Sequence, residues 1–142
     1  MSLYKSWMLV QIPIKCSQNI LNSAELTFND DGSARVSDTC NSYGGKFTLT
    51  DVIENGKFGT ITMTGGTGTQ MACEWETDEA THTAHMVDEF IQSLFKQPFG
   101  YTLHDDFLII FKDNQEYHFK EITHQVNNVS DLFDEYGFCN YK

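Results

Sequence analysis

The sequence predicts an α+β fold in which a curved antiparallel sheet or partial β-barrel carries one packed central helix and a short C-terminal helix. Three observations lead to this fold class. Short apolar segments of strand length, separated by turn residues, occupy both halves of the chain. One longer segment in the middle has helical periodicity, and no repeat or Pro/Gly/Ser linker divides the chain. Third, the length of 142 residues corresponds to one domain.

Five short segments before the predicted helix have the pattern of strands. The first is apolar and alternates in part, and Pro13 is expected to place it at a sheet edge or to end it in a turn. Residues 29–32, Asn-Asp-Asp-Gly, favour a hairpin between the second and third strands. The five predicted strands span residues 6–14, 24–28, 34–36, 46–50 and 58–63.

The central helix is predicted from both its start and its apolar face. Thr77 can accept a hydrogen bond from a first-turn amide as the N-cap residue, and Asp78 and Glu79 complement the positive end of the helix dipole. Apolar residues then recur at three- and four-residue intervals, a stripe that we expect to pack against the sheet. Pro98 closes the helix. The stripe consists of Val87, Phe90, Ile91, Leu94 and Phe95.

A three-stranded meander and a tail follow the helix. Residues 107–111 are apolar on both faces, so we expect one face to meet the helix and the other to meet the tail, a partner or a ligand. The tail is expected to form a short helix at residues 130–136, with Gly137 just beyond its end. The apolar residues that would pack the tail are Leu132, Phe133, Tyr136 and Phe138. The predicted strands span residues 99–104, 107–112 and 116–122, with turns at 105–106 and 113–114.

Charge and hydropathy exclude several classes of function. Nine Lys and Arg against twenty Asp and Glu give a net charge of −11, which repels phosphate backbones and anionic lipid. We therefore expect no nucleic-acid partner, and the apolar runs are too short for a transmembrane segment. No signal peptide is visible in residues 1–15, so the protein is expected in the cytoplasm if Met1 is native, and in the envelope or secreted if a leader has been removed.

The four cysteines are too few and too far apart for a disulfide-dense mini-protein or a paired CxxC zinc site. Spacing alone leaves three full pairings open. Four reduced thiols in a cytosolic protein are the alternative. The cysteines are Cys16, Cys40, Cys73 and Cys139.

Two further patterns are weak indications of a metal site and of a phosphate-binding loop. His82 and His85 are three apart on the predicted helix and Glu89 lies four beyond His85, a spacing that a metal could use. A solvated helix face is the interpretation that we favour, because no motif such as HExxH supplies a catalytic base. The glycine-rich residues 64–69 are expected to be a flexible connector, since the Lys of a phosphate-binding loop is missing.

Two short motifs precede the predicted helix. Residues 36–47, VSDTCNSYGGKF, contain Cys-Asn followed by an aromatic residue and Gly. Residues 68–73, GTQMAC, contain a Thr-x-Met-x-Cys stretch just before the helix. Both motifs resemble the signatures of META domains, the family that includes the HslJ heat-shock-inducible lipoproteins. The resemblance covers about residues 6–122 and implies a META/HslJ-like domain at 1–122, with residues 123–142 as a C-terminal extension that packs on the same domain.

The resemblance also implies a candidate site. It suggests that Cys40 and Cys73 lie close together, either as a disulfide or as adjacent thiols. The loop around them is expected to build a turn, with a binding role for its residues as the alternative. The candidates for contact with a ligand or partner are Asn41, Tyr43, Gly44, Thr69 and Met71.

The function expected from these observations is non-enzymatic binding of a protein partner or a small ligand, by a monomer or weak dimer without a cofactor. The resemblance associates the family with stress response and virulence, and implies no enzymatic activity. The alternative is a thiol- or metal-dependent enzyme centred on Cys40 and Cys73 or on His82 and His85. A third hypothesis is that the chain is a structural protein stabilised by its disulfide.

Overall fold

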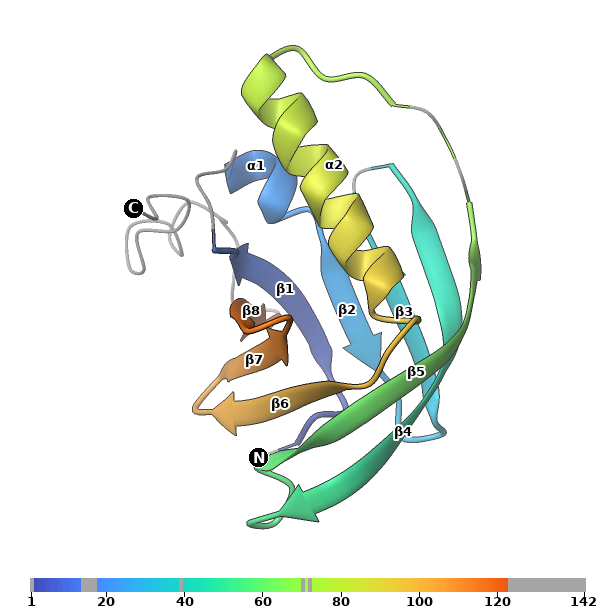
Figure 1. Cartoon of the computed structure of the whole chain (residues 1–142), viewed down its shortest axis with the longest axis vertical. Coiled ribbons are helices and arrows are strands. Elements are labelled where there is room, and N and C mark those ends of the chain that lie inside the picture. Colours follow the sequence, from blue (N-terminus) through green and yellow to red (C-terminus); the bar gives the residue numbers. More distant parts are fainter. Residues whose placement is uncertain (1, 14–17, 39, 70, 72, 123–142) are drawn as a thin grey trace.

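The computed structural model describes residues 2–13, 18–38, 40–69, 71 and 73–122. Within them, eight antiparallel strands close into a barrel in which every strand pairs with its neighbours in sequence order (Figure 1). A short helix follows the first strand, and the long helix lies between the fifth and sixth strands. The elements are β1 Ser6–Gln11, α1 Gln18–Leu21, β2 Glu25–Phe28, β3 Ser33–Ser37, β4 Ser42–Ile53, β5 Phe58–Gly68, α2 Asp78–Ser93, β6 Phe99–His104, β7 Phe107–Lys112 and β8 Gln115–Glu121.

The sheet is closed, where the sequence predicted a curved sheet or partial barrel. Closure comes from β1, which pairs with β2 on one side and with β8 on the other, so that Trp7 lies opposite both Leu26 and Glu121. The pairing between β1 and β8 joins segments more than 100 residues apart. A long-range contact of this kind leaves no local pattern in the sequence.

The apolar face of α2 completes the core of the barrel. Thr77 accepts a hydrogen bond from the Ala80 amide at the start of the helix, as its N-cap position predicted. Phe90 stacks on Tyr117 of β8 with 3.9 Å between the ring centroids. The predicted stripe is therefore the packed face: Val87, Phe90, Ile91 and Leu94 are buried, and Phe95 is partly buried against the core. Figure 1 shows α2 beside α1 at one end of the barrel, and these two helices are in contact.

The glycine-rich residues 64–69 were expected to be a connector, and this expectation is wrong for most of the segment. Residues up to Gly68 belong to β5 and pair with β4, with a register shift between Gly44 and Lys46. The glycines are needed because the two strands and Phe95 approach one another closely. A Cβ at Gly45 would lie 2.0 Å from the Thr64 carbonyl oxygen, and one at Gly66 would lie 2.9 Å from Phe95 Cγ.

The other expected elements agree with the structure within a few residues, apart from longer β4 and β5 and the additional α1. The two-residue turn at Asp113 and Asn114 has positive φ at both positions, as a type I′ hairpin requires. The helix predicted at residues 130–136, and the tail packing expected of residues 123–142, lie outside the described residues. No helix in the described part of the chain is long and apolar enough to cross a membrane.

Candidate functional site

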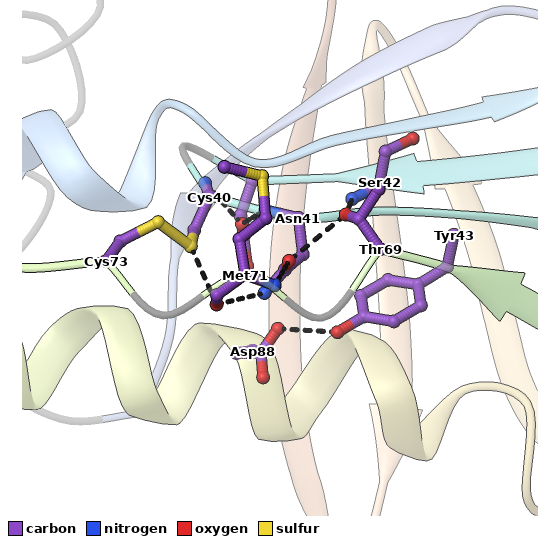
Figure 2. The surroundings of a disulfide bond; sticks show 9 residues. Cys40, Asn41, Ser42, Tyr43, Thr69, Met71, Cys73 and Asp88 are labelled. Carbon is purple, nitrogen blue, oxygen red and sulfur yellow. Dashed lines mark hydrogen bonds between the residues drawn. A yellow bond between two sulfur atoms is a disulfide. The ribbon is translucent and has the colours of Figure 1, made fainter.

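The candidate site lies where two connecting segments meet beside α2. The first joins β3 to β4 and contains Cys40 and Asn41; the second joins β5 to α2 and contains Met71 and Cys73. Figure 2 shows these residues together above α2, with Asp88 of the helix facing them. Segments about 30 residues apart in the sequence therefore form one local structure.

Asp38 fixes the conformation of the β3–β4 turn. Its carboxylate Oδ1 accepts hydrogen bonds from the backbone amides of Cys40, at 2.8 Å, and Asn41, at 2.7 Å. The Asp38 amide donates in turn to the Asn41 carbonyl at 2.9 Å. This turn, in which an aspartate side chain bonds the backbone ahead of it, holds Cys40 and Asn41 in fixed positions.

The Asn41 side chain joins the two connecting segments. Its Oδ1 accepts from the Met71 amide at 2.6 Å and from the Thr69 hydroxyl at 3.1 Å, while its Nδ2 donates to the Met71 carbonyl at 3.4 Å. Asn41 is buried, so these bonds satisfy an amide that would otherwise be costly to remove from water. Asn41 is thus a structural residue that positions the Met71 segment.

A disulfide between Cys40 and Cys73 makes the second link between the same segments. Its Cα atoms are 6.0 Å apart and its cysteines are separated by 33 positions in the sequence. Cys40 Sγ lies 3.2 Å from the Met71 carbonyl oxygen. In the disulfide this sulfur carries no hydrogen, so the approach is a packing contact rather than a hydrogen bond. Cys16 and Cys139 lie outside the described residues.

Tyr43 connects β4 to α2 beneath the turn. Its hydroxyl donates to Asp88 Oδ1 at 3.0 Å, and the Gln92 side chain donates to Asp88 Oδ2 at 2.6 Å. Burial, together with the Asp88 carboxylate, raises the pKa of Tyr43 to about 12. The tyrosine therefore stays a hydrogen-bond donor at physiological pH, and both Asp88 oxygens have a partner.

Beside the disulfide and α2 lies a pocket of about 270 Å³, which we call the disulfide pocket. Two acidic residues, Asp38 and Asp88, line it, together with Trp75. Burial raises the pKa of Asp38, and the nearby Asp88 carboxylate adds to this effect. The pocket is lined by Asp38, Cys40, Asn41, Met71, Cys73, Trp75, Ala84, His85 and Asp88.

The structure brings most of the candidate residues into this region, with three exceptions. Gly44 lines a different surface, formed by β2, β3 and β4. His82 and Glu89 are exposed on α2, and only His85 of that group lines the disulfide pocket. Among the described residues, no group of three His, Cys, Asp or Glu side chains is arranged to hold a metal ion.

Four residues that line the pocket were not identified from the sequence: Asp38, Trp75, Ala84 and Asp88. Asp38 stands within the first motif, two positions before Cys40, where an aspartate able to bond the following amides could have been noticed. Asp88 stands next to Val87, at the border of the apolar stripe of α2. An acidic residue at the edge of a packed helix face could have been noticed as a candidate site residue. Nothing local in the sequence distinguishes Trp75.

We expect Asn41→Ala to lower the free energy of unfolding by about 1–3 kcal/mol, because the substitution removes a buried side chain together with its hydrogen bonds to Met71 and Thr69. Urea denaturation measures the change. Asn29→Ala is the matched control, since the Asn29 side chain makes an exposed hydrogen bond within its own hairpin, and its cost should stay within about 0.5 kcal/mol. Equal effects of the two substitutions would contradict the joining role of Asn41.

Asp38→Asn is expected to stabilise the protein at neutral pH by roughly a few tenths of a kcal/mol, after allowance for solvent screening. A carboxyl whose folded pKa lies above its ordinary value of 3.8 contributes stability that is present below that value and is lost as pH rises through the folded pKa. Asparagine resembles the protonated form, so the difference between variant and wild type should vanish near about pH 3.

Asp31→Asn serves as a control of opposite sign for this pH dependence. Hydrogen bonds from the Ser33 side chain and amide lower the pKa of Asp31, so its contribution is present at neutral pH and is lost as pH falls through the folded pKa. The Asp31 variant should therefore be less stable than wild type at neutral pH, with the difference closing in acid. Thermal unfolding from about pH 3 to 7 gives both curves, and parallel curves would be inconsistent with the two environments.

The fold and the site define a class of protein: a small eight-stranded antiparallel barrel, completed by one helix, with two connecting segments clasped by a disulfide beside that helix. The chain belongs to the META domain family, whose model matches residues 2–123. This match confirms the resemblance carried by the two motifs. No curated protein matches the sequence.

Solved structures show the same fold at low sequence identity. An NMR structure of a protein from Burkholderia xenovorans matches with a TM-score of 0.59 at 19% identity, covering 85% of this chain and 83% of that chain. A crystal structure of a DUF4847-family protein from Bacteroides vulgatus matches with a TM-score of 0.54 at 13% identity, covering 87% of this chain and 96% of that chain. At these identities the likeness concerns the fold alone.

Proposed function

We propose that this META domain is a non-catalytic binding module whose disulfide pocket accepts a positively charged group, carried by a small ligand or by a protein partner. The observation that carries the proposal is that two aspartates and a tryptophan line one pocket. Asp38, Asp88 and Trp75 come from three different segments, and all line it. Carboxylates attract a cation by charge, and an indole face attracts it through its quadrupole.

The pocket has a size suited to a small group. Its volume of about 270 Å³ lies just below the usual range for ligand pockets, which begins at roughly 300 Å³. A single alkylammonium or guanidinium group is a suitable occupant. The net charge of −11 also favours the approach of cations over anions.

The residues of the pocket are fixed by hydrogen bonds and by the disulfide without a ligand. The bonds from Asp38 fix the turn, the Asn41 amide fixes Met71, and the disulfide fixes Cys73. Tyr43 and Gln92 orient the Asp88 carboxylate from below. A preorganised site loses little conformational entropy on binding, which supports binding as the role of the pocket.

The disulfide favours this proposal over the alternative of a thiol-dependent enzyme. Cys40 and Cys73 are bonded to each other, so neither sulfur is a thiolate nucleophile in this state. A role in stress response or host interaction, and a monomeric or weakly dimeric state, are proposals that come from the family resemblance and the surface charge.

Two small ions of similar shape and opposite charge test the proposal. We expect butylammonium to shift the NMR signal of the Trp75 indole and the backbone amides of Cys40, Asn41 and His85, and butyrate to leave them in place. Trp7 is an internal control, because its indole is buried in the core and donates to the Leu3 carbonyl at 3.1 Å. Equal shifts with both ions, or shifts scattered over the surface, would count against a cation site in this pocket.

A further inference from the structure

We propose that the disulfide between Cys40 and Cys73 is a reducible latch on the disulfide pocket, and that a dithiol reductant opens it. Reduction would free residues 73–76 from the β3–β4 turn and withdraw the Trp75 indole from the pocket wall. The consequence for ligand binding rests on the proposed function, whereas the release of the segment does not.

The disulfide is accessible from solvent through the pocket. Cys40 and Cys73 are each only partly buried, and both line the pocket wall. Thiol–disulfide exchange needs a nucleophile to reach one sulfur, and a disulfide sealed in a core would not permit this. The position of this bond in an open wall distinguishes it from a disulfide that only stabilises the fold.

The disulfide is also the attachment that holds the segment after Met71. Met71 is bound through its backbone to Asn41, and Thr77 is fixed as the N-cap of α2. Between these two points, the described residues 73–76 have no hydrogen bond to the turn, and Cys73 is joined to it by the disulfide. Trp75 stands in the middle of this segment, two positions from Cys73.

The rest of the site should survive reduction, which makes the change local. The Asp38 turn, the Asn41 bonds to Met71 and the Tyr43 bond to Asp88 involve no sulfur chemistry. The barrel and the position of α2 also rest on strand pairing and core packing. The expected product is a folded domain with a loosened pocket wall.

The chemical step is a two-electron exchange with a dithiol. One thiolate of the dithiol attacks Sγ of Cys40 or Cys73, the sulfur–sulfur bond breaks, and a mixed disulfide forms while the other cysteine leaves as a thiolate. The second thiol of the reductant then displaces the remaining cysteine. The protein gains two electrons and two protons as two thiols, and the dithiol becomes a cyclic disulfide.

The experiment uses full-length protein carrying Cys16→Ser and Cys139→Ser, so that Cys40 and Cys73 are its remaining cysteines. Dithiothreitol is the reductant, and its oxidised form returns the disulfide. We expect reduction to move the Trp75 indole signal toward its position in an unfolded peptide, with the Trp7 signal unchanged. Amide exchange at residues 73–76 should accelerate by about tenfold or more, while the core strands stay protected.

Two comparisons make the outcome decisive. The variant with Cys40→Ser and Cys73→Ser added should match the reduced protein and should not respond to dithiothreitol. An unchanged Trp75 signal and unchanged exchange at residues 73–76 after complete reduction would overturn the latch. If only the oxidised protein binds butylammonium, both proposals are supported. If the oxidised protein does not bind it, the proposed function fails, and the Trp75 and exchange measurements still decide the latch.

Discussion

Replacement of both Cys40 and Cys73 by serine is expected to lower the free energy of unfolding by about 3–4 kcal/mol. The disulfide links cysteines 33 positions apart, and without it the unfolded chain gains the conformations that this link removes. For a domain of this size, the loss corresponds to a fall in melting temperature of roughly 10–15 °C. Urea denaturation and calorimetry measure the two quantities.

Reduction of the disulfide in the wild-type protein is a control for the effect of the two substitutions. Dithiothreitol should lower the stability of wild type by a similar amount and leave the doubly substituted protein unchanged. The variant with Cys16→Ser and Cys139→Ser shows whether the other two cysteines contribute to the response. A loss of stability below about 1 kcal/mol in the Cys40 and Cys73 variant would contradict the role of the disulfide in joining the two segments.

Gly45→Ala is expected to destabilise the barrel by more than about 3 kcal/mol, because overpacking against backbone cannot be relieved by a rotamer change. The new Cβ would lie 2.0 Å from the Thr64 carbonyl oxygen and 3.1 Å from the Gly66 nitrogen, both backbone atoms of β5. Separation of β4 from β5 at this point would also disturb Phe95. Denaturant unfolding, or the yield of folded protein if the variant is too unstable, gives the result.

The neighbouring Gly44→Ala is the matched control for this substitution. A Cβ at Gly44 has its nearest contact at 4.0 Å, with the Ala34 carbonyl oxygen, so the methyl group fits without displacement. This variant should be within about 1 kcal/mol of wild type, since alanine also reduces the entropy of the unfolded chain. Similar stabilities for the two variants would contradict the close approach of β4 and β5.

Local patterns in the sequence predicted most of the secondary structure because the signals that produced them are themselves local. The Thr77 cap and the apolar stripe from Val87 predicted α2, and the turn residues at 105–106 and 113–114 predicted the last hairpins. The four-residue α1 is too short to show periodicity. The end of β5 was missed because glycines are depleted in ordinary strands, whereas here they permit a close approach that only the folded structure reveals.

Only the site residues that lie within the two META-like motifs could be predicted from the sequence. Cys40, Asn41, Thr69, Met71 and Cys73 were identified through resemblance to META domains, and no property of these residues alone places them together. Asp88 and Trp75 were missed because their position in the pocket depends on how α2 packs against the barrel. Electrostatic properties such as the raised pKa of Asp38 depend on the same packing.

The central claim, that the carboxylates of the disulfide pocket bind a cation, is tested most directly by the affinity for butylammonium in two matched double variants. Asp38→Asn with Asp88→Asn removes both pocket charges, whereas Glu25→Gln with Glu54→Gln removes two exposed charges outside the pocket. Titration followed at the Trp75 indole should show a loss of affinity of about tenfold or more for the first variant and little change for the second. Equal affinities for the two variants would contradict the claim, because binding would then depend on the net charge of the protein and not on this pocket.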